Sequence, residues 1–475
     1  MLPRGGLARH TAAAVGDTIT RRLHAQVRND RPTLRRRSLK VLVAKFRGEG
    51  MRAHLLRAVF GSGSMKAAQA LFALAITVVL ARVLGPKGYG EYSLAFSWMA
   101  LIAIPAQIGL PTLVVREVAK YQITGRWDML RGLLRWSNWT ALFISLGIGL
   151  MSGICSWVLL SETRPDLEKT FLSALLLVPI IALGNLRGAV LRGLRFIVYG
   201  QIPEMVLRPG FLLLLLLGAT AWIGDITPQI AMSLHVIAGL AAFILGAMFL
   251  MLVLPPEARQ VKPNFETVFW IRSLVPLTLL AGMQVVNAQI GIVMLGWFGS
   301  NEQVGIYRVA VQGAYLVAFS LVVVNMALAP NISRLHAIQD REKLQQLTTI
   351  SARLVFAMAL PICLVLMIFG GYILTLLFGS GYEAAHVAFA ILCLGHLINA
   401  GLGSVDMLLN MTGNEGATTR GFTIATMTNL GLGLLLIPRF DITGAAVAAS
   451  CSVVVWSGLL YIQVYRKLGV KSGIL

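Results

Sequence analysis

Polar side chains recur at helical spacing inside two long apolar stretches of the sequence. The first stretch carries Gln284 and Asn287, and the second carries His396, Asn399 and Asp406. Intervals of three or seven residues place such side chains on one face of an α-helix. Inside a membrane, polar side chains are costly and mark a functional path by default, although packed helices also use them for hydrogen bonds to each other. We call each set of side chains a polar stripe. We predict that both polar stripes bind a polar substrate, and hydrogen bonding between helices is the competing interpretation.

Arginines near the ends of the apolar stretches form a second set of candidate binding residues. A guanidinium group matches the oxygens of a phosphate or diphosphate in a bidentate way. The candidates for contact with such a substrate are Arg116, Arg187, Arg192, Arg208 and Arg272. A purely structural role is the alternative for each of them. Basic residues are retained on the cytoplasmic side of membrane proteins in any case, and Glu204 lies four residues before Arg208, the spacing of a helical ion pair.

The composition identifies the elements that would position these residues. Hydrophobic residues make up 57% of the chain, charged residues make up 13%, and the mean hydropathy is +0.75, which is typical of an integral membrane protein. Twelve apolar segments are long enough to cross about 30 Å of hydrocarbon as helices. They are 65–84, 92–113, 137–160, 171–191, 202–222, 230–254, 270–298, 306–329, 351–378, 385–409, 420–437 and 444–464. The prediction is an all-α polytopic membrane protein with twelve transmembrane helices in two parallel six-helix repeats.

Lysine and arginine are distributed unequally between the loops. The loops after even-numbered segments carry many of them, as in Arg116–Arg135 and Arg334–Arg353, whereas the loops after odd-numbered segments carry few, with Arg308 just inside the eighth segment. Because loops rich in Lys and Arg stay in the cytoplasm, we predict that both termini are cytoplasmic.

The first 60 residues differ in composition from the rest of the chain. They hold 14 Lys and Arg against 3 Asp and Glu, so +11 of the chain's net charge of +21 lies there. No apolar core with a cleavage site precedes Gly61, so a cleaved signal peptide is not expected. A cytoplasmic arm held to anionic membrane lipids is favoured over a nucleic-acid-binding arm, and a start of translation at Met51 is a further alternative. The predicted domains are this arm (1–60), a first six-helix bundle (61–256), and a second with a short cytoplasmic tail (257–475).

An internal repeat supports the division into two bundles. A turn is expected at Gly85, after which Gly90-Glu91-Tyr92 resembles Gly305-Ile306-Tyr307. Asp225-Ile226-Thr227 likewise returns as Asp441-Ile442-Thr443. Parallel repeats of this kind commonly place the substrate path of a transporter between the two halves, although chance similarity between glycine-rich turns is the alternative.

Several classes of function are disfavoured by the sequence. The predicted outer loops, such as Trp222–Gln229, are too short to present catalytic groups, so an enzyme is not expected. The four cysteines lie inside apolar segments without metal-ligand spacing, so no metal site is expected. No glycine-rich loop ending in Lys-Ser or Lys-Thr is present, so we expect no ATP hydrolysis and no cofactor.

The motifs LARVLGPKGYGEYSLA, IGLPTLVVREVAKY, VGIYRVA and LAPNISRLHA resemble the signatures of the polysaccharide biosynthesis and export proteins. This family is the oligosaccharide-lipid flippase branch of a superfamily that also contains multidrug exporters and the lipid II flippase. The resemblance covers residues 61 to about 470. It implies two six-helix bundles around a polar cavity that opens alternately to each side.

The function implied by this resemblance is transport of a polyprenyl-diphosphate-linked oligosaccharide to the outer leaflet of the bacterial inner (cytoplasmic) membrane. Such a flippase serves the biosynthesis of surface polysaccharide, for example lipopolysaccharide O-antigen or exopolysaccharide. Its expected partners are the lipid-linked oligosaccharide, membrane lipids, and glycosyltransferases or a polymerase of the same pathway, and no nucleic acid. The alternative is an ion-coupled multidrug or cation exporter of the same superfamily.

Overall fold

The computed structural model describes residues 51–107, 109–222 and 224–474, and their side chains except at 51–62, 273, 275–281, 326, 327 and 330. Most of the predicted basic arm (residues 1–50) therefore lies outside the described residues. Every contact given below lies within the unit Gly61–Leu475.

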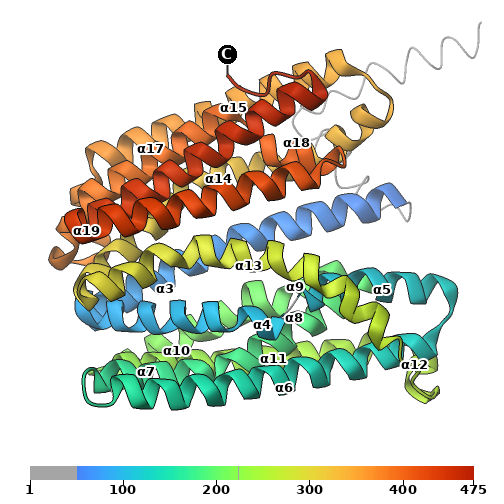
Figure 1. Ribbon diagram of the computed structural model, residues 1–475, viewed down its shortest axis with the longest axis horizontal. Helices are drawn as coiled ribbons and strands as arrows, with labels where there is room; N and C mark the ends of the chain where they lie inside the picture. Colours follow the sequence, from blue (N-terminus) through green and yellow to red (C-terminus); the bar gives the residue numbers. More distant parts are fainter. Residues whose placement is uncertain (1–50, 108, 223, 475) are drawn as a thin grey trace, which may run out of the picture. The chain divides into compact units, whose positions relative to one another are not determined.

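Helices account for every regular element of the described residues (Figure 1). A helix is the expected structure for these long apolar runs, because it satisfies all of its backbone hydrogen bonds within one segment. The elements of the first part are α3 (Met51–Ile102), α4 (Ile104–Gln107), α5 (Leu110–Thr124), α6 (Trp127–Leu160), α7 (Pro165–Leu175), α8 (Leu177–Gly193), α9 (Ile197–Ile202), the π-helix η1 (Pro203–Leu207), α10 (Arg208–Trp222), α11 (Pro228–Val253) and α12 (Pro256–Gln260). They are followed by α13 (Thr267–Phe298), α14 (Asn301–Ala337), α15 (Arg341–Ile368), α16 (Gly370–Phe378), the short 3-10 helix η2 (Ser380–Ala385), α17 (His386–Leu402), α18 (Val405–Met411) and α19 (Glu415–Leu468).

Two groups of helices are built from consecutive parts of the chain. In the first group, α5, α6, α7 and α11 all pack on α8, and α10 packs on α11. In the second group, α14 packs on α15, α17 and α19, and α17 also packs on α15 and α19. Figure 1 shows the second group in orange and red, with α13 lying between it and the first group. Helix α13 contacts α14 and α19 of the second group and α4 and α5 of the first, so it connects the two.

Nine helices of the described part are long and apolar enough to cross a membrane. The protein is therefore a multi-pass membrane protein. Two of these nine are kinked: α3 turns at Gly85 (φ 65°, ψ 177°), and α19 turns at Asp441 (φ 47°, ψ −125°). The turn expected at Gly85 is confirmed, and it needs glycine because a side chain is strained at this positive φ.

Several predicted segments are not single helices: 92–113 is divided among α3, α4 and α5, 171–191 between α7 and α8, and 351–378 between α15 and α16. The segment 385–409 was expected to be a single helix, but α17 ends at Leu402 and α18 begins at Val405. Gly403 between them has φ 77° and ψ −163°, a conformation outside the helical region. The apolar run continues through this position, so hydropathy alone does not reveal the break.

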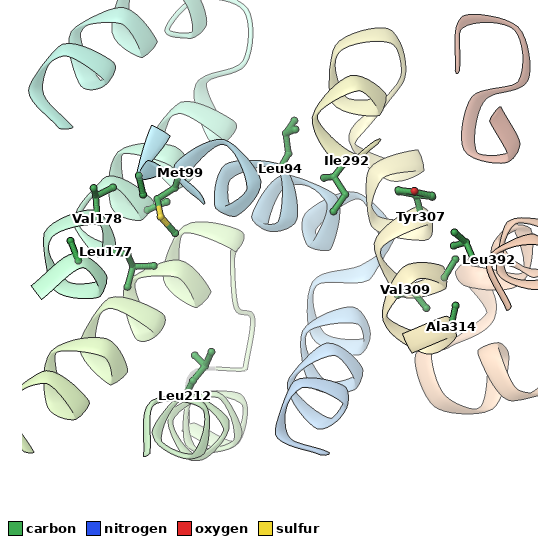
Figure 2. Close-up of a cluster of buried hydrophobic side chains, with 14 of the residues drawn as sticks. Leu94, Met99, Leu177, Val178, Leu212, Ile292, Tyr307, Val309, Ala314 and Leu392 are labelled. Atoms are coloured by element: carbon green, nitrogen blue, oxygen red, sulfur yellow. The ribbon is translucent and has the colours of Figure 1, made fainter. Parts of the chain in front are cut away.

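Buried apolar side chains form a continuous cluster through both groups of helices (Figure 2). It reaches from Val178 of α8, through Leu94 of α3, to Tyr307 of α14 and Leu392 of α17. Helices gain little from the hydrophobic effect inside a membrane, because lipid tails are as apolar as leucine, so close packing supplies much of the attraction between them.

Glycines of the repeat bring the backbones of α3 and α14 into close contact. A Cβ atom added to Gly90 of α3 would lie 1.6 Å from the carbonyl oxygen of Asn301, and one added to Gly305 of α14 would lie 2.1 Å from the carbonyl oxygen of Pro86. The side-chain amide of Asn301 donates a hydrogen bond of 3.2 Å to Glu91. We call this contact the glycine crossing. It requires glycine at both positions, because any side chain would hold the backbones apart.

Candidate functional site: a polar cavity between α3, α10, α11 and α14

A polar cavity of about 180 Å³ lies between helices of both groups. Its walls come from both parts of α3, from η1, α10 and α11 of the first group, and from α14 of the second. The polar side chains that line it are Gln69, Thr77, Tyr89, Tyr92, Ser93, Glu204, Arg208, His235, Arg308 and Gln312. We call this space the polar cavity.

A π-helix positions the charged residues of the first group. In η1 the backbone N–H of Arg208 donates to the carbonyl oxygen of Pro203, five residues earlier, rather than to that of Glu204. Proline has no N–H of its own, so the regular ladder is already interrupted here. Single π turns of this kind widen the helix locally and are frequent at functional sites.

The two charged residues of this turn face each other in the cavity wall. Nη1 of Arg208 lies 3.1 Å from a carboxylate oxygen of Glu204, and both side chains are mostly buried, at 22% and 18% exposed. The Glu204 carboxylate fits against α8 because Gly184 leaves room for it: a Cβ on Gly184 would lie 2.4 Å from the Glu204 oxygen. Glu204 is therefore the present counter-ion of Arg208.

Arg308 supplies a second cation from the other group of helices. It lies on α14, one turn before Gln312, and both side chains line the polar cavity. Its guanidinium group makes no ion pair with any described carboxylate. An unpaired charge within a membrane span is costly and marks a functional position by default. With Arg208, Arg308 and Glu204 together, the polar cavity has a net charge of +1.

An aromatic hydrogen-bonded pair forms the remaining wall. The hydroxyl of Tyr92 and Nδ1 of His235 are 2.8 Å apart, which joins α3 to α11. The ring of Phe96 stacks on His235 with 5.6 Å between the ring centroids. These contacts hold the second part of α3 against α11 of the first group.

The polar cavity has the chemistry of an anion site. Guanidinium groups from two helices present fixed N–H donors to one space, and hydroxyl and amide groups surround them. No group of three or more metal-ligating side chains was found among the residues that the structure describes.

Comparison with known proteins identifies the family. The family model described as "Polysaccharide biosynthesis protein" matches residues 55–336, which is more than half of the chain. The chain belongs to this family.

Two relatives match most of the chain and about a third of it, respectively. It is 22% identical over 395 residues to a putative O-antigen transporter of Shigella flexneri, covering 80% of this chain and 90% of the relative. It is 27% identical over 175 residues to a probable flippase, AglR, of Haloferax volcanii, covering 35% of each chain.

Solved structures share its fold at low sequence identity. A multidrug resistance MATE family transporter in an inward-facing conformation has a TM-score of 0.69 at 15% identity, covering 84% of this chain and 94% of that one. The lipid II flippase MurJ in an inward closed conformation also has a TM-score of 0.69, at 13% identity, covering 85% of this chain and 87% of that one. The chain therefore shares the fold of these two proteins.

The structure places one of the five predicted arginines, Arg208, in the polar cavity. Arg187 packs within the first group, where its guanidinium donates to the carbonyl oxygen of Phe243 at 3.0 Å and lies 3.4 Å from the centre of that ring. Arg192 of α8 is half-buried close to Gly200 of α9, and Arg272 of α13 is exposed. These three residues are not brought together with Arg208 around the cavity.

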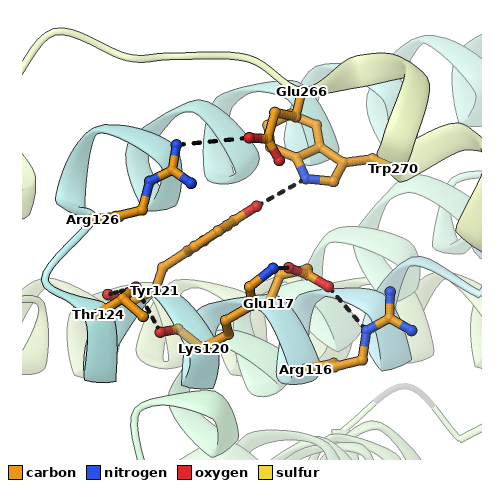
Figure 3. A network of polar contacts seen from close by, with 8 residues as sticks. All are labelled: Arg116, Glu117, Lys120, Tyr121, Thr124, Arg126, Glu266 and Trp270. Atoms are coloured by element: carbon orange, nitrogen blue, oxygen red, sulfur yellow. Dashed lines mark hydrogen bonds and ion pairs between the residues drawn. The ribbon is translucent and has the colours of Figure 1, made fainter.

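Arg116 belongs to a separate polar network at the end of α5 (Figure 3). Its Nε donates to Glu117 at 2.9 Å, and Lys120 lies 3.7 Å from the same carboxylate. In the same network the indole of Trp270 donates to the hydroxyl of Tyr121 at 3.3 Å, which ties α13 to α5. Burial raises the pKa of the Tyr121 phenol.

The predicted polar stripes lie in contacts within the second group and with α13. Asn287 of α13 accepts a hydrogen bond of 2.9 Å from Asn429 of α19, and Asn399 of α17 accepts one of 2.6 Å from Ser457 of α19. These two residues make the hydrogen bonds between helices that were the competing interpretation of the stripes. Gln284 is exposed on α13.

His396 and Asp406 are separated by the break at Gly403. His396 lies on α17, and its Nδ1 is buried without a hydrogen-bond partner among the described residues. Asp406 lies in the first turn of α18. Neither lines the polar cavity, so substrate contact by these two residues stays a prediction and would have to occur elsewhere.

Arg308, Tyr92 and His235 were not predicted from the sequence as site residues. Arg308 was recognised only as a basic residue just inside the eighth apolar segment. The signal that could have identified it is its depth: Arg308 lies eight residues into the apolar helix Asn301–Asn325, where an arginine is costly without a function.

Proposed function

We propose that this protein is a membrane flippase that moves a polyprenyl-diphosphate-linked oligosaccharide from the cytoplasmic to the outer leaflet. The observation that carries the proposal is the pair Arg208 and Arg308, which enter one polar cavity from helices of different groups. A diphosphate that leaves water needs counter-charges, because an unpaired ion in a low-dielectric space costs several kcal/mol. The family membership and the names of the relatives support a glycan carrier of this type.

The transport cycle would be alternating access between two six-helix bundles. The glycine crossing supports this scheme, because it joins the two groups of helices through backbone contacts that can separate without unfolding either group. The substrate would enter from the cytoplasmic side while the glycine crossing closes the other side of the polar cavity. It would leave on that other side after the crossing has opened. Arg308 would move with the second group and Arg208 with the first, so the cationic pair would widen or narrow during the cycle.

The proposed topology has twelve membrane passes in the inner membrane, with both termini in the cytoplasm. Support comes from the two kinked helices, since each of α3 and α19 is long enough for two passes, and from α13, whose part Gly282–Phe298 is a shorter apolar helix. The loop charges described above support the orientation. In this arrangement the glycine crossing faces the outer side of the membrane.

The test uses matched arginine variants. Membrane vesicles containing the full chain are supplied with lipid-linked oligosaccharide, and its arrival in the opposite leaflet is followed with a lectin that cannot cross the membrane. Arg208→Ala and Arg308→Ala should abolish arrival, and Arg308→Lys should restore part of it, because lysine keeps the charge but loses the planar fork. Arg341→Ala is the control, since this exposed arginine lies at the start of α15 and outside the cavity. The amount of protein in the membrane is measured by immunoblot for each variant.

Two results would overturn the proposal. Full transport by both alanine variants would show that the cationic pair does not receive the substrate. Loss of transport in Asp406→Asn, with both alanine variants active, would favour the alternative of an ion-coupled exporter of cations, because such an exporter depends on an acidic group rather than on arginines.

A further inference from the structure

A second cavity, of about 530 Å³, lies on the other side of the second part of α3. Its walls come from four helices, and they are mostly apolar, with Leu94 and Trp98 of α3, Leu159 of α6, Phe171 of α7 and Trp297 of α13 among the lining residues. We call it the apolar pocket. Its size falls within the range of about 300–1,000 Å³ that is typical of ligand sites.

Helix α3 separates the apolar pocket from the polar cavity. Tyr89, Ser93 and Phe96 line the polar cavity, whereas Leu94 and Trp98, one helical turn apart, line the apolar pocket. No residue lines both. A lipid whose head group is held in the polar cavity would therefore have to pass around α3 to place its chain in the apolar pocket.

One cation stands in the wall of the apolar pocket. Arg164 precedes the first turn of α7, and its Nη1 donates to the carbonyl oxygen of Gly296 on α13 at 3.2 Å. It makes no ion pair with any described carboxylate, and a guanidinium group has five N–H donors, so further donors remain for a ligand. The arginine side chain is exposed, so these donors can meet an anion from outside the protein.

Exposed tryptophans indicate the depth of this site. Trp157 of α6 and Trp297 of α13 are 65% and 74% exposed; Trp157 lies near the end of α6 that leads to Arg164, and Trp297 directly follows Gly296. Tryptophans exposed near the ends of membrane helices gather where the head groups meet the hydrocarbon. A lipid phosphate at this level would lie beside Arg164 while its chain extends among the apolar side chains.

We propose that the apolar pocket binds one hydrocarbon chain of an anionic phospholipid from the surrounding leaflet, with the lipid phosphate on Arg164. The apolar lining alone does not select a lipid, because a chain in the pocket leaves an environment that is already hydrocarbon. Selection comes from the charge: a cation near the membrane surface favours an anionic lipid by about fivefold, equivalent to about 1 kcal/mol.

Occupancy of the pocket is coupled to the position of α13 relative to α3. A Cβ on Gly296 would lie 2.4 Å from Leu94, so the two helices are in close contact at the pocket. Because α3 packs on the first group while α13 packs extensively on α19, a movement between the groups changes the pocket. The bound lipid would therefore stabilise the arrangement seen in this structure. This inference does not depend on the identity of the transported substrate.

A native cysteine provides the test. Cys155 lines the apolar pocket and is exposed, whereas Cys363 and Cys393 are buried and Cys451 is half-buried. The full chain carrying Cys451→Ser is placed in nanodiscs of phosphatidylcholine alone or with added phosphatidylglycerol. The rate at which Cys155 reacts with N-ethylmaleimide, an uncharged reagent, is then measured by mass spectrometry of the peptide.

Phosphatidylglycerol should slow the reaction of Cys155 severalfold, and Arg164→Gln should remove most of this protection. Lys169→Gln is the matched control, because Lys169 is an exposed cation of the same segment that does not line the pocket, and it should keep the protection. Thermal unfolding of each variant in the nanodiscs checks the fold. If the Arg164→Gln variant does not fold, the unaltered protein is treated with phosphatidylglycerol that carries a photoreactive group on its hydrocarbon chain. This lipid should label α3 or α6 at the pocket.

Two outcomes would overturn the proposal. The first is that phosphatidylglycerol has no effect on Cys155, and the second is that Arg164→Gln is protected as well as the unaltered chain. In the first case, protection of Cys155 by polyprenyl phosphate would assign the pocket to the chain of a carried lipid.

Discussion

Alanine at the glycine crossing should shift the protein away from the arrangement seen here. In Gly90→Ala the new Cβ would lie 1.6 Å from the carbonyl oxygen of Asn301 and 3.0 Å from the backbone nitrogen of Gly305. Ordinary contact begins at 3.4 Å, so the two helices must separate by about 1.8 Å. The opposing atoms belong to the backbone of a helix and cannot rotate away.

The cost of this separation can be compared with known overpacking substitutions. These cost about 1–3 kcal/mol, which would change the balance between closed and open crossings by about 5- to 150-fold. Intrinsic helix propensity does not cause such a shift, because alanine is favoured over glycine in a helix by about 0.5–1 kcal/mol whether the crossing is closed or open. A loss of the closed state would therefore report on the contact itself. Gly147→Ala and Gly431→Ala are matched helical controls, since a Cβ at either position meets nothing within 4 Å.

The assay measures access to the polar cavity from outside the cell. Gln312→Cys places a thiol in the cavity wall, in a chain that also carries Cys155→Ser. Spheroplasts are treated with a maleimide that cannot cross the membrane. We expect faster labelling of position 312 in Gly90→Ala and slower transport, with both controls behaving like the unaltered chain. Unchanged labelling in a folded Gly90→Ala protein would refute the idea that the crossing closes the outer side of the cavity.

Three further outcomes are expected. Reporters fused at Ser161 should be active outside the cytoplasm and those at Arg126 inside it, and a reversed result at either position would contradict the twelve-pass topology. Asn429→Ala should lower the stability of the protein in detergent by about 0.6–1.7 kcal/mol, because it removes the hydrogen bond to Asn287 between α19 and α13; no shift in the unfolding curve would mean that this bond adds nothing. Asp406→Asn should reduce transport only moderately, since asparagine keeps the size and hydrogen bonding of the side chain, and complete loss of transport would assign this carboxylate a direct role.

Hydropathy predicted the all-helical class because each membrane helix satisfies its own backbone within one segment, and it predicted the ends of some helices closely. The expected segment 230–254 corresponds to α11 at Pro228–Val253, nearly residue for residue. The break at Gly403 was missed because the residues around it remain apolar through a non-helical backbone. In such a place only a glycine at positive φ distinguishes the break from a continuous helix.

The candidate site was predicted less completely, because its residues meet across the fold rather than along the chain. Arg208 was recognised by its type, but nothing near it in sequence indicates that Arg308, on a helix of the other group, enters the same cavity. Asn287 and Asn399 had the spacing expected of a polar path, yet their partners Asn429 and Ser457 are on α19. The spacing of polar residues indicates which face of its helix a side chain occupies. The hydrogen-bond partner of that side chain is determined by how the other helices pack against this face.

The π-helix η1 has a consequence for how relatives of this chain should be aligned. A π turn contains one more residue than an α-turn of the same length. The extra residue rotates the side chains of the preceding helical residues by about 100° about the helix axis, relative to those of α10. Members of the family that lack the extra residue should show a one-residue gap within Pro203–Leu207 and should point the residue equivalent to Glu204 away from their cavity. Their arginine at the start of α10 would then have no internal counter-ion. A gap at this place would thus separate, by sequence alone, chains that balance the cavity charge internally from chains that depend on the substrate to do so.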